Sequence, residues 1–411
     1  MNMDLIRPGR PGRGYDPTAH FTDLRWYLFH QRNVVYFAAF STRDHDRPAA
    51  LALARRVVRL LPHLGEGHRG AAPGRPPGDD LLERLIGIET IDGFAGLPDR
   101  WIGDGMAALS DPGLPFFRVR IGRLADGPDA EGRRSFLLIQ ASHALAEGAD
   151  SARLSRSREA AHPAGTARRS TPAAIRFAAR AFAALAVPMH LLVARIWTPH
   201  SGTIRVETRM FPRALFSRLA RKLGVRQRVL FMALVAHVIT GAGSRAGRRR
   251  VSATYSTLDS EGGDRDPFMR MRMLFASFEN HPEFGAFARK LDARLAAAEA
   301  SESGFNAEMN AAAVAFHRRL AMRFPWLYSP KVFAFMPYDF VFALIPPHRL
   351  AGPLTEGLVE PVYCGATTPG INGCVVVPGR TMVTFNFYLE ENLLPRIERL
   401  DRILGPDLPP A

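Results

Sequence analysis

The stretch over residues 135–154 constrains the fold of this chain more than any other. Its sequence is SFLLIQASHALAEGADSARL. Residues 135–141 form an almost continuous apolar run, which is typical of a strand buried on both faces. A polar turn with His143 follows, and a segment with helical spacing begins near Ala149. The stretch therefore predicts a strand, a turn and a helix in a parallel or mixed sheet, with polar atoms at the carboxyl end of the strand, where such folds place their chemistry.

Three residues of this turn are candidates for functional roles. The imidazole of His143 can take a proton from an alcohol or amine nucleophile at about pH 7. The Glu147 carboxylate could hold the turn by pairing with an arginine, and Gly148 would let a substrate approach the backbone. The alternative is that His143 is only a hydrogen-bonded histidine at a strand end. Its neighbours favour the functional interpretation.

The segment from Ser142 to Gly148 resembles the HHxxxDG motif of the CoA-dependent acyltransferase superfamily. This superfamily includes the condensation domains of nonribosomal peptide synthetases and the bacterial wax ester synthase/diacylglycerol acyltransferases. Residues 114–121 resemble the strand that precedes the motif, with its PLW or PLF element. Ser142 replaces the first histidine of the motif, and Glu147 replaces the aspartate. The second histidine is the catalytic one in the family, and His143 takes its place.

The resemblance implies an α/β fold with two chloramphenicol-acetyltransferase-like lobes, each a mixed sheet with helices, around a central tunnel. We expect one lobe in residues 1–160, a linker and an apolar helix in 161–199, and the other lobe in 200–411. His143 would be the catalytic base, Glu147 would brace the loop, and Gly148 would leave room for the donor. Ser142 and Asn386, the latter in the last predicted strand, would bind substrate.

The implied activity is O-acyl transfer from acyl-CoA, or from a carrier thioester, to a lipophilic acceptor such as a long-chain alcohol or diacylglycerol. Acyl-CoA would be a co-substrate, and no other cofactor and no metal is expected. The alternative is a relative of the same fold, non-catalytic or of the condensation type, that acts as a binding or scaffold protein. A catalytic assay with acyl-CoAs distinguishes the two.

Composition and net charge indicate which classes of binding partner the protein could have. At 411 residues, with 47% hydrophobic and 23% charged residues, the chain is long enough for two or more compact units. The net charge of +15 favours anionic partners, namely CoA phosphates, carrier proteins or anionic lipid. Nucleic acid is not expected as a partner, because the densest basic run, residues 248–250, is short and lacks interleaved aromatics. A nucleic-acid binder is the third hypothesis, and its affinity would fall steeply with salt.

The cysteine count and the apolar stretches indicate a cytoplasmic protein, with membrane association as the alternative. Cys364 and Cys374 are the only cysteines, so no disulfide framework or zinc site is implied. The amino-terminal residues are polar, and the longest apolar stretches, 181–194 and 229–242, are shorter than the roughly 20 residues that span a bilayer. Residues 172–197 form an apolar helical pattern with arginines near both ends. This segment is either a helix buried between the lobes or a helix on a membrane surface.

The remaining pattern predicts strands and helices in both lobes. The predicted strands are 34–40, 116–124, 204–210, 251–259, 271–278, 340–344 and a hairpin of 373–377 with 381–389. The predicted helices are 48–61, 211–223, 228–240, 284–300 and 305–324. Gly224 is expected to end the helix before it.

Overall fold

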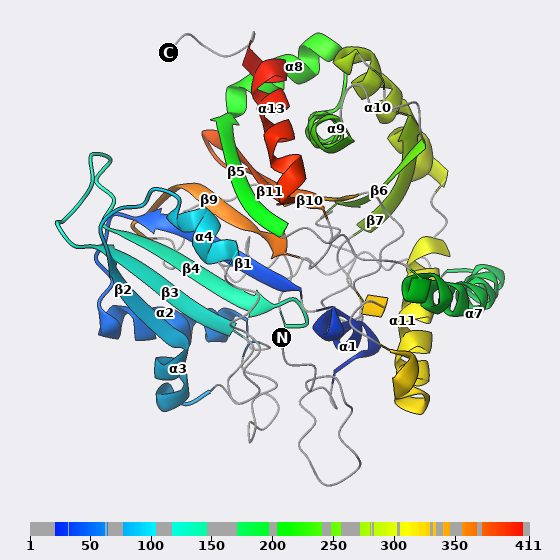
Figure 1. Ribbon diagram of the computed structural model, residues 1–411, viewed down its shortest axis with the longest axis horizontal. Coiled ribbons are helices and arrows are strands. Elements are labelled where there is room, and N and C mark those ends of the chain that lie inside the picture. The colour runs from blue at the N-terminus through cyan, green and yellow to red at the C-terminus, as the bar shows by residue number, and fades with distance from the viewer. Residues whose placement is uncertain are drawn as a thin grey trace.

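The computed structural model describes residues 21–31, 33–61, 64, 77–103, 117–145, 171–196, 204–240, 248–255, 272–279, 281, 283–301, 305–328, 332–333, 340–345, 356–367 and 372–405. In this part of the chain, two mixed β-sheets with covering helices form two lobes (Figure 1). The α/β fold class predicted from the sequence is confirmed. Residues 161–170, the first part of the predicted linker and apolar helix, lie outside the described residues.

The first sheet positions the segment that contains His143. Its strands, in spatial order, are β2 (Ile86–Ile91), β3 (Phe117–Leu124), β4 (Ser135–Ser142), β1 (Val34–Ser41) and β9 (Leu358–Thr367). β2 runs parallel to β3, and the other neighbours are antiparallel. β4 lies at the centre and is buried along its whole length, as its apolar run predicts. Helices α2 (Arg47–Leu60) and α3 (Asp79–Leu85) pack against this sheet, and α4 (Leu97–Gly103) lies at its other face (Figure 1).

Strand β9 comes from the carboxyl-terminal part of the chain but completes the first sheet beside β1. The sequence analysis contains no strand here, because Pro361 and Gly365 interrupt the β-pattern of this segment, and both residue types are depleted in strands. β9 lies at the edge of its sheet, where a proline without an N–H is tolerated. The two halves of the chain therefore share a sheet.

The second sheet forms the core of the other lobe. Its strands, in spatial order, are β5 (Ile204–Pro212), β11 (Met382–Glu390), β10 (Gly373–Pro378), β8 (Phe340–Leu344), β6 (Arg248–Tyr255) and β7 (Arg272–Glu279). Helix α9 (Gln227–Thr240) is enclosed by this curved sheet and by α8 (Arg213–Leu223), α10 (Phe284–Ser301) and α13 (Glu398–Leu404) (Figure 1). The enclosure explains why α9 is apolar on all sides. Gly224 ends α8 in the left-handed conformation, with φ at 67°, as predicted.

A third group of helices lies beside the two lobes. It consists of α1 (Asp23–His30), α7 (Ala173–Ile196) and α11 (Phe305–Arg323), followed by the short helix η4 (Pro325–Leu327). α7 packs against α11 and lies at the outer edge of the molecule (Figure 1). It has 24 residues, and an 18-residue window within it has a mean hydropathy of 1.7, so it is long and apolar enough to cross a membrane by length and composition alone. The apolar helix predicted over residues 172–197 is confirmed, and it is longer than the apolar stretch 181–194 because it continues through Arg180 and Arg176.

Candidate functional site

His143 directly follows the central strand β4, at the end that points toward the middle of the molecule beside α1 (Figure 1). The strand fixes its place because both neighbouring strands bond β4 along its length. The last registered pair is Val34 with Ser142, and the His143 N–H continues the ladder by donating to the Asn33 carbonyl at 2.8 Å. His143 is half-buried, so its imidazole is held by the fold and still partly accessible.

Two local hydrogen bonds shape the turn around His143. The Leu145 N–H donates to the Ser142 carbonyl at 2.9 Å, and the Ala144 N–H donates to the Ser142 hydroxyl at 3.3 Å. A serine side chain that accepts from the backbone two residues later is a common way to close a turn. Ser142 therefore stabilises the turn that presents His143. Its predicted contact with substrate stays a prediction.

Arg25 on α1 also stabilises this turn, through a hydrogen bond to its backbone. Its Nε donates to the Ala144 carbonyl at 2.8 Å, and its guanidinium lies 4.6 Å from the centre of the Phe21 ring. The side chain is only 6% exposed. A buried charge–carbonyl hydrogen bond is among the stronger polar contacts in proteins. The sequence analysis missed Arg25, although one arginine inside the mostly apolar segment 21–29 is the signal that could have found it.

A second polar connection links the turn to the other half of the chain. Asn33, whose carbonyl accepts from His143, donates from its side-chain amide to the Gln31 side chain at 3.2 Å. Gln31 in turn donates to the Phe333 carbonyl at 3.5 Å. Both amide side chains are buried, and the Asn33 Oδ1 atom has no hydrogen-bond partner among the described residues. Polar side chains in the segment between α1 and β1 therefore connect the backbone of His143 to Phe333.

The other predicted site residues are not gathered at this turn within the described part of the chain. Glu147 and Gly148 lie outside the described residues, so their roles stay predictions. Asn386 on β11 is fully buried where the two sheets meet. Its amide donates to the Cys364 and Val375 carbonyls, at 3.4 Å each, and its Oδ1 accepts from the Thr208 hydroxyl at 3.4 Å.

The strand register separates Asn386 from His143. Cys364, to which Asn386 donates, pairs with Phe37 on β1, and Phe37 pairs with Ile139 on β4. This level is about 10 Å along β4 from Ser142 and two strands away, on the order of another 10 Å. The position of Asn386 supports a structural role between the two sheets.

The junction of the sheets also contains buried titratable groups. The Tyr36 hydroxyl on β1 is hydrogen-bonded to the Tyr388 hydroxyl on β11, and burial raises the pKa of both far above the usual range. Burial also raises the pKa of Asp99 on α4, although its carboxylate accepts a 2.9 Å hydrogen bond from Thr208. These groups connect α4 and the first sheet to the second sheet. They stabilise the relative placement of the lobes on which a site between them depends.

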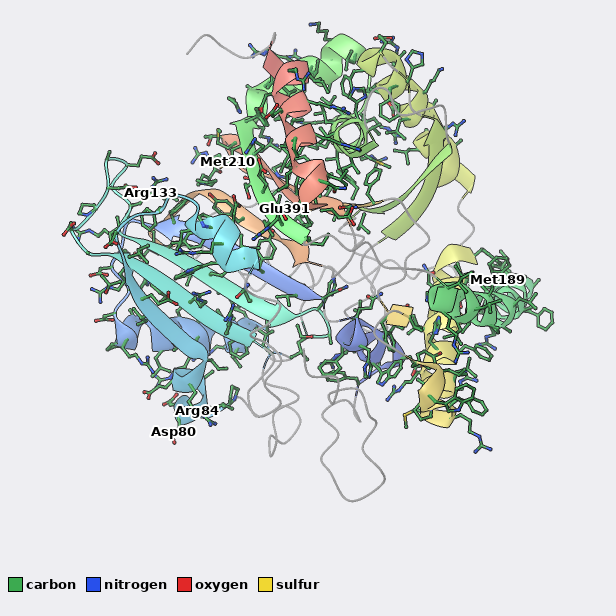
Figure 2. The ribbon with its side chains drawn as sticks, viewed as in Figure 1. Asp80, Arg84, Arg133, Met189, Met210 and Glu391 are labelled. Atoms are coloured by element: carbon green, nitrogen blue, oxygen red, sulfur yellow. The ribbon has the colours of Figure 1, made fainter. Side chains whose placement is uncertain are left out.

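Two of the cavities lined by described residues are large enough to hold a small molecule, and His143 lines neither of these two. One, of about 550 Å³, lies between α4, the β3–β4 hairpin, β5 and β9, where Arg133 and Met210 approach from the two lobes (Figure 2). Its lining residue Phe40 pairs with Phe136 near the start of β4, so the cavity lies near the end of the strand opposite to His143, on the order of 23 Å away along it. The other, of about 470 Å³, lies between α7 and α11. The expected tunnel at His143 therefore stays a prediction.

No protein family model and no curated protein matches the chain by sequence. Solved structures match over most of its length. A wax ester synthase/diacylglycerol acyltransferase from Marinobacter aquaeolei VT8 matches with a TM-score of 0.53 and 14% identity, over 94% of this chain and 97% of that one. A trichothecene 15-O-acetyltransferase from Fusarium sporotrichioides matches with a TM-score of 0.58 and 8% identity, over 92% of both chains.

A nonribosomal peptide synthetase cyclization-docking bidomain, EpoB from Sorangium cellulosum, matches with a TM-score of 0.52 and 14% identity, over 93% of this chain and 83% of that one. The structural overlap establishes a shared fold. The sequence identities are too low to establish a shared reaction. The chain shares the fold of these acyltransferases and of the cyclization-docking bidomain, so the fold that the resemblance implied is confirmed.

Proposed function

We propose that this protein is an acyltransferase that moves an acyl group from a CoA or carrier-protein thioester to the hydroxyl of a lipophilic acceptor. The observation that carries the proposal is the placement of His143. It stands at the carboxyl end of a fully buried central strand, in a turn that Arg25 and Asn33 hold from outside. A base fixed in this way loses little freedom when it meets a substrate, which is the condition for efficient proton transfer.

The proposed reaction uses His143 as general base. A neutral imidazole nitrogen takes the proton of the acceptor hydroxyl while the hydroxyl oxygen attacks the thioester carbonyl carbon. The tetrahedral intermediate then expels the thiolate as the carbon–sulfur bond breaks, and the imidazolium returns its proton to the sulfur. The products are an ester and a free thiol. The buried Asn33 Oδ1 is an additional acceptor close to the His143 backbone that could bind a donor group of the substrate.

The preference for a lipophilic acceptor rests on the resemblance, and the wax ester synthase/diacylglycerol acyltransferase among the structural matches supports it. The cyclization-docking bidomain among the same matches supports a carrier thioester as the alternative donor. The net charge of +15 suits either donor, because CoA carries phosphates and a carrier arm is attached to its protein through one.

The test is incubation of the protein with a panel of acyl-CoAs and carrier thioesters, each with a long-chain alcohol or diacylglycerol. Free thiol and the ester product are measured together. We expect both to form in equal amounts with at least one pair of substrates. Thiol without ester would indicate hydrolysis only. Absence of both over the whole panel would contradict the proposal and favour a binding or scaffold protein.

A further inference from the structure

The solvent-facing side of α7 carries the largest apolar side chains of that helix. They are between 53% and 78% exposed: Phe177, Phe182, Leu185, Met189, Leu192 and Ile196. The side that packs on the body of the protein is lined mostly by smaller residues: Ala179, Ala183, Val187, Leu191 and Ala194. A surface helix of a globular protein normally has the opposite arrangement, with its bulky apolar residues against the core.

The exposed residues form one continuous row. Phe177, Leu185, Met189, Leu192 and Ile196 are spaced by multiples of about 3.6 residues, so they lie above one another along the helix. Met189 projects from the outer side of α7, at the edge of the molecule (Figure 2). We call this row, together with Phe182, the outer face of α7. An exposed apolar surface of this length on one helix indicates an interaction site.

Arginines lie near both ends of α7, beside the outer face, and Arg180 also lines the cavity between α7 and α11 together with Glu308 and Arg319. α7 contains Arg176, Arg180 and Arg195, all exposed, and no acidic residue. The neighbouring α11 adds exposed arginines at its carboxyl-terminal end. The Arg195 guanidinium lies 5.7 Å from the centre of the Trp326 ring, which is 71% exposed. Arginine and tryptophan side chains beside an apolar helix face are typical of the membrane–water interface.

We propose that α7 docks this protein on the surface of an anionic lipid bilayer. The outer face lies at the boundary between headgroups and acyl chains, and the flanking arginines bind headgroup phosphates. This inference goes beyond the proposed acyl transfer and does not depend on it, because docking is measured without substrate.

The structure argues against two other arrangements of α7. A second copy of the chain packed on the same face would bring together arginines that no acidic residue of α7 offsets. A helix crossing the bilayer would have to leave α11, because Leu191 and the other inner residues are buried in the fold. His190 on α7 also forms a 2.9 Å hydrogen bond with the Val332 carbonyl, which ties the helix to the body of the protein. Docking in the plane of the membrane keeps all these contacts.

Flotation with lipid vesicles tests the proposal. We expect the full chain to float with vesicles of phosphatidylcholine and phosphatidylglycerol, to float far less with phosphatidylcholine alone, and to be released by high salt. The triple variant Leu185→Gln, Met189→Gln, Leu192→Gln should lower the partition at least about tenfold. Its melting temperature should match the parent, because all three side chains are exposed.

A matched pair of charge variants separates docking through α7 from attraction by net charge. The change of Arg176, Arg180 and Arg195 to glutamine should weaken binding roughly 100-fold, since each arginine near the surface contributes about fivefold. The control changes Arg59, Arg84 and Arg221 to glutamine. These arginines are exposed on α2, α3 and α8, and Arg84 lies across the molecule from Met189 (Figure 2). The control should bind almost as the parent does.

A polarity-sensitive dye at Leu185→Cys gives a second measurement that does not depend on a polar substitution. Both native cysteines are buried, so the introduced thiol is the reactive one. Its emission should shift to the blue with anionic vesicles, whereas a dye at Ser217→Cys on α8 should not respond.

Five results would overturn the proposal, and the first four concern binding, charge, the dye and the oligomeric state. The first three are absence of vesicle binding by the parent, equal weakening by the two charge variants, and no spectral shift of the dye at position 185. The fourth is a parent dimer that the triple glutamine variant converts to monomer, which would assign the face to a second copy. Resistance to high salt with release only by detergent would indicate a spanning helix and would overturn docking in the membrane plane.

Discussion

Acidification should destabilise the fold through His317. This residue on α11 is 4% exposed, and its Nδ1 lies 2.9 Å from the Tyr328 hydroxyl. The rings of His190 and Tyr27 contact it at 4.9 and 5.5 Å between ring centres. Burial, with a smaller contribution from His190, lowers the pKa of His317 from 6.5 to about 3. Protonation of this side chain therefore opposes folding.

The sign and size of the effect follow from the two pKa values of His317. A histidine whose pKa is lower in the folded state contributes stability that is complete above the unfolded value of 6.5 and is lost as the pH falls toward about 3. Each pH unit in this window removes about 1.4 kcal/mol of the free energy of unfolding. At ~pH 5 the loss is therefore ~2 kcal/mol relative to neutral pH.

The assay is urea unfolding at neutral pH and at ~pH 5, for the parent and for His317→Gln. Glutamine cannot titrate but can keep a hydrogen bond with Tyr328. All other titrating groups, including His190 with its lowered pKa, are common to both proteins and cancel in the comparison. We expect the parent to lose ~2 kcal/mol more than the variant between the two pH values. An equal loss in both would refute the reasoning.

Substitutions at three further positions test the contacts that hold the sheets and the His143 turn in place. In Gly365→Ala the added Cβ would lie 3.0 Å from a tyrosine hydroxyl of β1, so unfolding in urea should require about 1–3 kcal/mol less free energy. Gly87→Ala in the same sheet, where the nearest atom is 3.9 Å away, is the matched control and should be close to neutral. Arg25→Met removes the hydrogen bond to the turn and should lower kcat for acyl transfer roughly 100-fold, and Arg25→Lys, which keeps a donor, should recover part of it. A kcat unchanged in Arg25→Met would show that the turn does not need this contact. Glu147→Ala should lower the free energy of unfolding by about 1–3 kcal/mol, because the resemblance assigns the carboxylate an arginine partner, and Glu147→Asp should be mild. Equal stability of the two Glu147 variants and the parent would show a solvated carboxylate.

The strands that the sequence predicts well are those with an uninterrupted local signal. The apolar run of β4 and the polar hairpin before it place β3 and β4 side by side, and the structure pairs them with Phe117 opposite Ala141. β9 carries a proline and a glycine, so its local pattern argues against a strand. Pairing with β1 outweighs that local preference, and such pairing between segments over 300 residues apart is invisible to periodicity.

The residues of the candidate site also fall into those with a local sequence signal and those without one. His143 is predictable because its motif and the strand before it are contiguous in the sequence. Arg25 is not, because its hydrogen bond to the Ala144 carbonyl spans 119 positions of the chain. Asn386, to which the resemblance assigns a substrate contact, donates from its amide to two carbonyls inside the junction of the sheets, and the sequence does not show these bonds. Hydrogen bonds between distant elements need the folded geometry.

The same distinction applies to α7. Its extent and apolar character follow from its helical spacing, but which face points outward does not. Leu191 and Leu192 are adjacent and chemically identical, yet the first is 8% exposed and the second 60%. The position of α11 decides between them, because it covers the smaller residues of α7.

The most direct test of the account is the rate of thiol release from acyl-CoA in the presence of acceptor, compared between the parent and His143→Ala. His281→Ala is the matched control, because His281 is also a half-buried histidine and lies in the other lobe, before α10. Loss of a general base predicts a kcat/KM lower by about 10²–10⁴-fold for His143→Ala, with an unchanged melting temperature and with His281→Ala at the parent rate. A folded His143→Ala protein that keeps most of the parent rate would contradict the assignment of His143 as the catalytic base.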